Sequence, residues 1–259
     1  MNTIEKDDTL HVGTTLLEIG SLLMSSGAST MRIRHTMNRI AHALGFNIEL
    51  MITHRALLLT LSDEDGEHLF SRIKRISPHG VNFKMVSGIS HMSWNIVDEK
   101  WGLEKINKEI DRLKSQAHYP RIIILTCVAL ADAGFCHNIG GGWIEMLIAC
   151  IATFCGLFVR QEFMKKQFNP YICVFLAALT ASIIAATSKF IPYEIMTNKA
   201  LATSVLFLIP GVPLINSITD LIDGNLQNGI IRGINGLMLC FAIACGLLIT
   251  ALIFKLQLI

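Results

Sequence analysis

Several ionisable side chains lie within or beside long apolar runs in the second half of the chain, and four of them are candidates for a functional role. Asp132 stands near the middle of one run, whereas Asp220, Asp223 and Arg232 flank the turn between two later runs. An ionisable residue inside a bilayer is costly, so it is interpreted first as part of a substrate or ion pathway. Asp132 could carry a coupling proton. The alternative is a protonated carboxyl that packs against a neighbouring serine or threonine.

Prolines interrupt the apolar run that precedes Asp220. Its sequence LFLIPGVPLINSITDLIDG places Pro210, Gly211 and Pro213 near the centre. Because each proline removes a backbone donor, a helix must kink or break there. Discontinuous helices expose backbone groups to polar substrates in many transporters. We therefore expect a broken span that belongs to the substrate pathway.

Polar side chains recur at helical spacing on both sides of the following turn. Asn216, Asp220 and Asp223 form one set, and the second set is Asn225, Asn228, Arg232 and Asn235. Spacings of three and four residues place each set on one helical face. We expect two facing stripes that form a vestibule at the cytoplasmic end of a pore, in which Asp220 meets the substrate or holds Arg232. A plain interfacial salt bridge between Asp220 and Arg232 is the alternative.

The apolar runs themselves match the thickness of a bilayer. Of the 42 charged side chains, 28 lie in residues 1–120 and 14 in residues 121–259. Runs of about 17 or more apolar residues are typical of transmembrane helices. The sequence predicts five spans, at about Ile122–Ile139, Trp143–Val159, Tyr171–Phe190, Leu201–Ile222 and Gly233–Phe254. The fold class is therefore an α-helical protein of the lipid bilayer with five transmembrane helices.

Basic residues predict how these spans are oriented. They cluster before the first span and after the second, and these are Arg112, Lys114, Arg121, Arg160, Lys165 and Lys166. Positively charged loops face the cytoplasm, and the N-terminus has no apolar signal segment. We expect a bacterial plasma (inner) membrane protein with its N-terminus in the cytoplasm and its C-terminus outside. Lys189 and Lys199 would then lie outside.

Residues 1–118 are predicted to form a soluble cytoplasmic α+β domain, and residues 119–259 the membrane domain. Helical periodicity covers Leu10–Met24 and Thr30–Leu44, with Ser29 as the N-cap of the second helix. Three β-branched or leucine-rich runs follow, at 47–53, 56–62 and 68–76, with a turn at 63–66 between the last two. Helices return from Asn82 to Glu99 and from Leu103 to Leu113.

Composition argues against several functional classes. Net charge is +2 overall, so the chain lacks the strongly basic composition that binding to a nucleic acid requires. All seven cysteines lie in the apolar half, so the soluble half has no thiolate zinc site, and we expect neither a metal nor a cofactor. The histidines of the soluble half form no hydrolase motif. A membrane-anchored, hydrolase-like enzyme or a sensor module nevertheless remains the alternative to a transporter.

Two segments together resemble a known family. They are LLMSSGASTMRIRHTMNRIAHALGF in the soluble half and LIPGVPLINSITDLIDGNLQNGIIRG around the broken span. With the segment GLEKINKEIDRL and five spans, the chain is similar over nearly its whole length to the threonine/serine exporters. Pro210, Gly211, Pro213, Asn216 and Asp220 match the family's pattern in the fourth span; Asp132 is our own assignment.

The resemblance implies a function and a partner. Members of the family have either ten spans in one polypeptide or ten spans split between a larger subunit with the soluble domain and a small five-span subunit. This chain resembles the larger subunit. The resemblance implies ion-driven (here proton-coupled) secondary export of small hydrophilic metabolites, either threonine/serine-type amino acids or a dicarboxylate such as succinate, together with a small five-span membrane partner.

Overall fold

The structure of the chain is a computed structural model that describes residues 3–62, 68–76, 80–116, 119–190 and 197–256. The chain divides into two compact units. The first unit comprises residues 1–117 and 212–234, and the second comprises residues 118–211 and 235–259. The boundary between a soluble region and a membrane region at residue 118 remains a prediction. By packing, however, residues 212–234 belong with the N-terminal residues.

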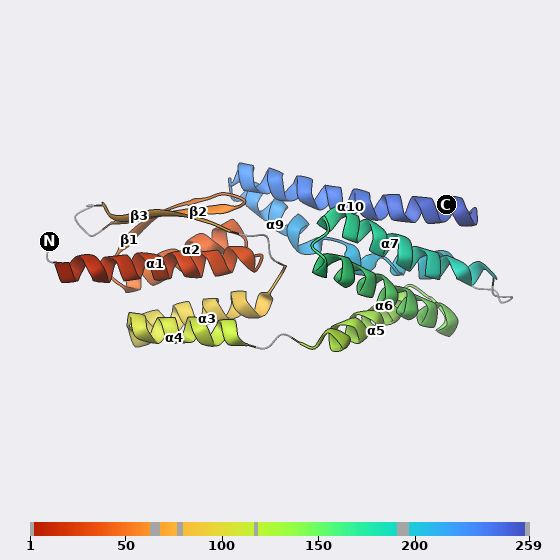
Figure 1. The fold of residues 1–259 in the computed structure, drawn as a ribbon, viewed down its shortest axis with the longest axis horizontal. Coiled ribbons are helices and arrows are strands. Elements are labelled where there is room, and N and C mark those ends of the chain that lie inside the picture. The colour runs from red at the N-terminus through yellow and green to blue at the C-terminus, as the bar shows by residue number, and fades with distance from the viewer. Residues whose placement is uncertain (1–2, 63–67, 77–79, 117–118, 191–196, 257–259) are drawn as a thin grey trace. The chain divides into compact units, whose positions relative to one another are not determined.

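Two helices open the first unit (Figure 1). Helix α1 (Thr3–Ser25) begins before the predicted Leu10 and ends within one residue of the predicted Met24, and α2 (Thr30–Ala43) follows it. Ser29 is confirmed as the N-cap of α2, because its hydroxyl accepts a hydrogen bond from the backbone N–H of Arg32 at 3.4 Å. Gly27 has φ +83°, a conformation that glycine adopts without strain, and it lets the chain reverse between the two helices.

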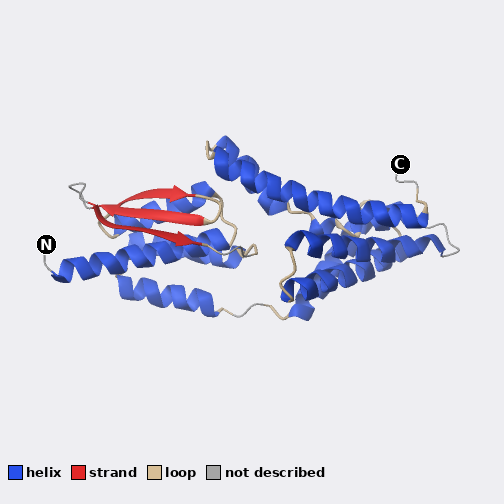
Figure 2. Cartoon of the chain, turned by 45° about the horizontal axis from the view of Figure 1, so that its top comes forward, coloured by secondary structure: helices blue, strands red, loops and turns tan. Residues whose placement is uncertain are grey.

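The three predicted strands form one antiparallel sheet in chain order (Figure 2). They are β1 (Asn47–Ile52), β2 (Ala56–Ser62) and β3 (His68–Arg75), each within one residue of its predicted bounds. Along β2 the side chains of Leu57, Leu59 and Leu61 are buried, and those between them are partly exposed. This alternation means that one face of the sheet packs against the helices. The predicted turn at 63–66 lies outside the described residues.

Helix α1 packs closely on the sheet through two glycines seven residues apart. A Cβ atom added at Gly13 would lie 2.6 Å from the ring of Phe70, and one added at Gly20 would lie 2.4 Å from a methyl group of Leu57. The missing side chains therefore make room for two apolar residues of the strands. This contact is part of a hydrophobic core built from residues between Val12 and Leu113.

Two further helices complete the N-terminal part of the first unit. They are α3 (Phe83–Glu99) and α4 (Leu103–Ser115), as the periodicity predicted. Asn82 caps α3 by accepting a hydrogen bond from the backbone N–H of Met85 at 3.1 Å. The predicted order of two helices, three strands and two helices is thus confirmed.

The second unit consists mainly of long apolar helices, including α5 (Arg121–Asn138), α6 (Trp143–Lys165) and α7 (Pro170–Ala186), which the short helix η1 (Thr187–Phe190) continues. With α10 (Leu226–Phe254), four helices of the described residues are long and apolar enough to cross a membrane. A fifth span is reached only if a bent pair of shorter helices is counted as one.

This bent pair is the span that the sequence predicted to be broken. Its first part contains α8 (Thr197–Thr203) and the short helix η2 (Leu206–Leu208), and its second part is α9 (Gly211–Ile222). The segments 199–208 and 211–222 are bent by 62°. Pro210 lies at the break, where a residue without a backbone N–H cannot continue the hydrogen-bond ladder. The predicted break is confirmed.

Helix α10 begins earlier than expected. The sequence placed its start at Gly233, whereas the helix begins at Leu226 and runs for 29 residues. The extra turns pack against α9, because the hydroxyl of Ser217 donates a hydrogen bond to the carbonyl oxygen of Gly229 at 2.7 Å. A bilayer needs only about 20 helical residues. The polar start of α10 was missed because it is not apolar enough to be recognised as part of a span.

Candidate functional site

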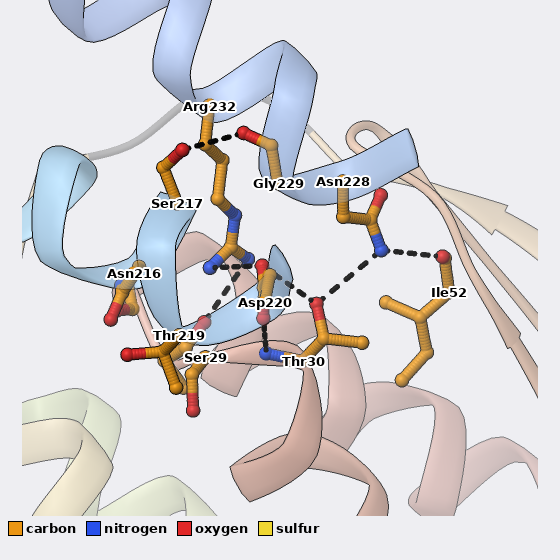
Figure 3. A network of polar contacts seen from close by, with 12 residues as sticks. Ser29, Thr30, Ile52, Asn216, Ser217, Thr219, Asp220, Asn228, Gly229 and Arg232 are labelled. Atoms are coloured by element: carbon orange, nitrogen blue, oxygen red, sulfur yellow. Dashed lines mark hydrogen bonds and ion pairs between the residues drawn. The ribbon is translucent and has the colours of Figure 1, made fainter. Parts of the chain in front are cut away.

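In the first unit the polar face of the α9–α10 hairpin contacts the turn between α1 and α2 (Figure 3). We call this contact the polar junction. It consists of the side chains of Thr30, Asn216, Asp220, Asn228 and Arg232 with the backbone carbonyls of Gly27, Ala28 and Ile52. Each helix contributes two polar residues four positions apart, which places both on one face.

Asp220 lies at the centre of the polar junction and is fully buried. Its Oδ1 accepts a hydrogen bond from the backbone N–H of Thr30, and its Oδ2 accepts one from the Thr30 hydroxyl, both at 3.1 Å. Thr30 is the first residue of α2, so its N–H has no acceptor inside the helix. The positive end of the helix dipole also favours a carboxylate there. Asp220 thus caps α2 from a position 190 residues further along the chain.

Arg232 supplies the opposite charge. Its Nη1 lies 3.2 Å from Oδ2 of Asp220, and its Nη2 donates a hydrogen bond to the carbonyl oxygen of Ala28 at 3.2 Å. Among the described residues Nη1 has no hydrogen-bond partner, so its contact with Asp220 is an ion pair without hydrogen-bond alignment. A charge as buried as Asp220 requires such a partner. The salt bridge that the sequence raised as an alternative is therefore present.

Two asparagine amides extend the polar junction to the backbone of distant segments. Nδ2 of Asn216 donates to the carbonyl oxygen of Gly27 at 2.8 Å. Nδ2 of Asn228 donates to the carbonyl oxygen of Ile52, at the end of β1, at 2.8 Å and to the Thr30 hydroxyl oxygen at 3.3 Å. The Thr30 hydroxyl therefore accepts from one residue and donates to another. The α9–α10 hairpin is joined in this way to both the helical turn and the sheet.

His54 follows β1, and its pKa depends on its burial and on nearby positive charges that include Arg232 of the polar junction. Burial lowers the pKa of His54 from its ordinary value of 6.5, and the positive charges of Arg55 and Arg232 lower this pKa further. The neutral imidazole is consequently the favoured form in the folded protein. A proton on His54 would add a third positive charge beside these two arginines.

The polar stripes predicted for α9 and α10 converge, and they do so on the protein's own turn. Both carboxylate oxygens of Asp220 are engaged by Thr30 and Arg232. In this arrangement the polar junction holds chain segments together, and Asp220 is not presented to solvent. Asp223 lies apart from the polar junction, because its residue is exposed just beyond the end of α9.

Asp132 belongs to the second unit and has quite different surroundings. It is 6 % exposed on α5, and its Oδ2 accepts a hydrogen bond from the hydroxyl of Thr153 on α6 at 2.7 Å. That hydroxyl also lies 3.5 Å from the carbonyl oxygen of Ser204, which follows α8. Among the described residues no basic side chain forms an ion pair with Asp132. The threonine partner agrees with the packing alternative considered from the sequence.

The remaining predicted site residues lie at the break. Pro210 is buried, whereas Gly211 and Pro213 are partly exposed at the start of α9. A Cβ atom added at Gly211 would meet no atom within 4 Å. The structure therefore places three predicted residues at the break, three in the polar junction, and Asp132 and Asp223 outside both groups.

Sequence reasoning missed the role of Thr30 and of the carbonyls of Gly27 and Ala28. The segment GAST that contains them was used to predict the helix cap at Ser29 and to support the family resemblance, but not to predict a contact with Asp220. A signal was nevertheless present, because this segment and the segment around Asp220 are the two on which the family resemblance depends. The structure shows that they contact each other. Within the described part of the chain, no group of three histidine, cysteine, aspartate or glutamate residues could hold a metal ion.

Comparison with known proteins gives a consistent result. Residues 14–254 match the family described as "Putative threonine/serine exporter". The chain is 29 % identical to the "Probable succinate transporter subunit YjjP" of Escherichia coli K12 over 93 % of its own length and 94 % of that protein. The protein of the same description from Klebsiella aerogenes is 27 % identical, with 93 % of each chain covered.

A third relative is much longer than this chain. The "Threonine/serine exporter" of Corynebacterium glutamicum is 24 % identical over 80 % of this chain, but the match covers only 44 % of that protein. No solved structure matches the chain.

Proposed function

The chain belongs to the threonine/serine exporter family, and from this premise we propose that it is the larger subunit of a two-polypeptide, proton-coupled exporter of small carboxylate metabolites. Membership makes it a membrane exporter, and the names of its relatives point to transport and not to an enzyme. The finer elements of the proposal are the partner, the coupling ion, the substrate and the orientation in the bacterial plasma membrane.

The extent of the matches is the observation that carries the proposal. The match covers 94 % of a relative described as a transporter subunit, but only 44 % of a relative described as a threonine/serine exporter. A chain whose relatives are described as subunits is expected to need a second part of the transporter. We propose that a small five-span membrane protein of the same family supplies it, because midplane transport sites form between two such repeats.

For the substrate we propose a dicarboxylate of the succinate type, since the relatives that match along their full length are described as succinate transporter subunits. Export of threonine or serine is the second candidate, which the family description and the Corynebacterium relative favour. Both substrates are small and carry carboxylates. We place their path at the break around Pro210, Gly211 and Pro213, where irregular backbone can meet polar groups at membrane depth.

We propose Asp132 as the coupling site. It is buried on a candidate span, it has a single hydroxyl donor in Thr153, and it has no ion-pair partner among the described residues. A carboxyl without a fixed counter-charge can gain and lose a proton during a cycle, and chains of such acids serve as proton relays in transporters. Asp223, which is exposed, is proposed as a second acidic group that substrate or solvent can reach.

Reconstitution in proteoliposomes tests the function. The chain is co-expressed with a small five-span family member, purified as a complex, and assayed for uptake of radiolabelled succinate and threonine with and without an imposed proton gradient. We expect gradient-driven succinate transport by the complex and none by the single chain. Full transport by the single chain would contradict the two-polypeptide form, and threonine transport without succinate transport would select the second candidate.

Cysteine labelling tests the orientation. In a variant that lacks the seven native cysteines, a membrane-impermeant thiol reagent should label Asn138→Cys and Lys255→Cys from outside the cell, but not Lys165→Cys. All three positions are exposed in the structure, so accessibility to the reagent depends on the side of the membrane. Labelling of the third variant from outside would contradict a cytoplasmic N-terminal region.

A further inference from the structure

The α9–α10 hairpin is held in the first unit by polar contacts and contributes nothing to its hydrophobic core. That core is built from residues between Val12 and Leu113, and no residue of the fully described 212–234 segment belongs to it. The apolar residues of α9 point elsewhere, since Ile215, Ile218 and Ile222 are 65 %, 59 % and 80 % exposed. Hydrogen bonds and one ion pair therefore determine where α9 lies within this unit.

Two of these contacts act on the same face of α9. Asn216 and Asp220 are one helical turn apart, and both bind the Gly27–Thr30 turn, through the carbonyl oxygen of Gly27 and the two donors of Thr30. Two attachment points on one face fix both the position and the rotation of a short helix. Since α9 begins directly after the break at Pro210, its placement also determines the direction in which the chain leaves the break.

We propose that the polar junction is a positioning device for the exporter, in which Thr30 and Asp220 set the orientation of α9 without touching the substrate. This inference rests on the proposed export function. It assigns a transport role to the Gly27–Thr30 turn, a segment far from the spans in sequence. Asp220 then does not bind the substrate, because both of its carboxylate oxygens already contact Thr30 or Arg232. Its effect on transport is indirect and runs through Thr30.

The chemistry of the contact predicts which substitutions preserve it. Asp220→Ala removes the acceptor of both Thr30 donors and the partner of Arg232. Thr30→Val keeps the backbone N–H and the Asp220–Arg232 ion pair but removes the hydroxyl, whereas Thr30→Ser retains every polar group. Asp98→Ala is the matched control, because it removes an exposed aspartate of the first unit that lies on α3 and outside the polar junction.

The first measurement is hydrogen–deuterium exchange of the Thr30 amide. This N–H lies in the first helical turn, where no intrahelical acceptor is available, and its partner is Oδ1 of Asp220. We expect Asp220→Ala to accelerate its exchange at least about 10-fold, since a lost hydrogen bond to a charged group corresponds to roughly one power of ten or more. Asp98→Ala should leave the rate unchanged. Unchanged protection in Asp220→Ala would overturn the proposal.

The second measurement is transport by the reconstituted complex, with radiolabelled succinate and threonine as probes. We expect Asp220→Ala to lower kcat at least about 10-fold and Thr30→Val about 3- to 10-fold, with KM within about 2-fold of wild type, because α9 is misplaced while the substrate contacts are kept. Thr30→Ser and Asp98→Ala should transport like the wild type. A purely structural role would lower the amount of folded complex without this split between kcat and KM.

Contrary outcomes separate this inference from the proposed function. If the wild-type complex exports neither probe, the proposed function fails and this inference fails with it. If the wild type exports and Asp220→Ala does so with unchanged kcat, only the positioning role is overturned. A raised KM with unchanged kcat in Asp220→Ala would also overturn it, since that result indicates direct substrate binding by the carboxylate.

Discussion

The two compact units fill their interiors with side chains of different size. Among the described residues the largest fully buried side chains all lie in the first unit, for example Leu16, Met37 and Leu57, whereas many buried positions of the second unit are alanines such as Ala177 and Ala181. In water, burial of large apolar surface stabilises the fold. Lipid provides no such driving force, so membrane helices associate through small residues that permit close approach. The contrast is consistent with our prediction that the N-terminal region folds in water and the long apolar helices fold in lipid.

The buried acids of the two units differ in the same way. Asp220 in the first unit has an arginine, a backbone N–H and a hydroxyl as partners, which together stabilise the charged carboxylate. Asp132 in the second unit has one hydroxyl donor and no ion-pair partner among the described residues. A fully paired acid suits a constant structural contact. An acid without a counter-charge suits a group that changes its protonation state during transport.

The largest effect is expected from neutralising the acid of the second unit. Asp132→Asn should reduce gradient-driven export to background, because an amide cannot carry a proton, while counterflow exchange without a proton gradient persists. Stability should change by less than about 1 kcal/mol, since the amide oxygen still accepts a hydrogen bond from Thr153. Both transport modes are measured in proteoliposomes, with Asp98→Asn, at an exposed position of α3, as the control. Wild-type gradient-driven export by Asp132→Asn would make this acid a packing group like its counterpart in the first unit.

The next largest effect concerns the paired acid of the first unit. Asp220→Ala should lower the free energy of unfolding by about 3–5 kcal/mol, because it leaves the largely buried Arg232 without its partner. Exchanging the two charges, as Asp220→Arg with Arg232→Asp, should not restore this stability. The exchange directs a guanidinium toward the two donors of Thr30 and toward the positive end of the α2 dipole. Denaturant unfolding in detergent micelles, compared with Asp223→Ala, measures both changes.

Recovery of wild-type stability in the exchanged variant would have a clear meaning. It would indicate that the ion pair alone stabilises the polar junction and that the hydrogen bonds from Thr30 contribute little. The number of hydrogen-bond partners would then not explain how Asp220 differs from Asp132.

The sequence predicted local structure well and predicted long-range contacts poorly. Strand bounds came out within one residue and the helix break was placed at Pro210, because alternation, helical period and proline chemistry are local properties. The same reasoning placed Asp220 in a vestibule, where it would meet the substrate or hold Arg232, and the contact with Arg232 is present. Nothing in a single sequence shows that Thr30, 190 residues away, supplies two donors to Asp220. The start of α10 was missed for a related reason, since a polar helical turn packed against α9 does not resemble a membrane span.

A smaller effect is expected from the close helix packing of the second unit. A Cβ atom added at Gly156 on α6 would lie 2.9 Å from the Cβ of Ala181 and 3.0 Å from the carbonyl oxygen of Ala177, so the backbones of α6 and α7 would have to separate. Gly156→Ala should therefore destabilise the protein by about 1–3 kcal/mol. Gly134→Ala on α5 is the matched control, because an added Cβ there meets no atom within 4 Å. Equal stability of the two variants in detergent unfolding would show that the small-residue packing of this unit is not required.

The smallest effect is a pH dependence that is specific to the first unit. The pKa of His54 is lowered by burial and by the charges of Arg55 and Arg232, so the unfolded chain binds a proton there more readily than the folded protein does. The stabilisation from the neutral imidazole is complete above the ordinary pKa of 6.5 and is lost as pH falls from that value through the lowered one. His54→Gln should remove this part of the loss, so that stability between about pH 7.5 and 5.5 falls less steeply than in the wild type. Denaturant unfolding of both proteins across this range measures the difference. An identical pH slope would show that neither burial nor the two arginines lowers the pKa of His54 in the folded protein, and this pH dependence would then not distinguish the two units.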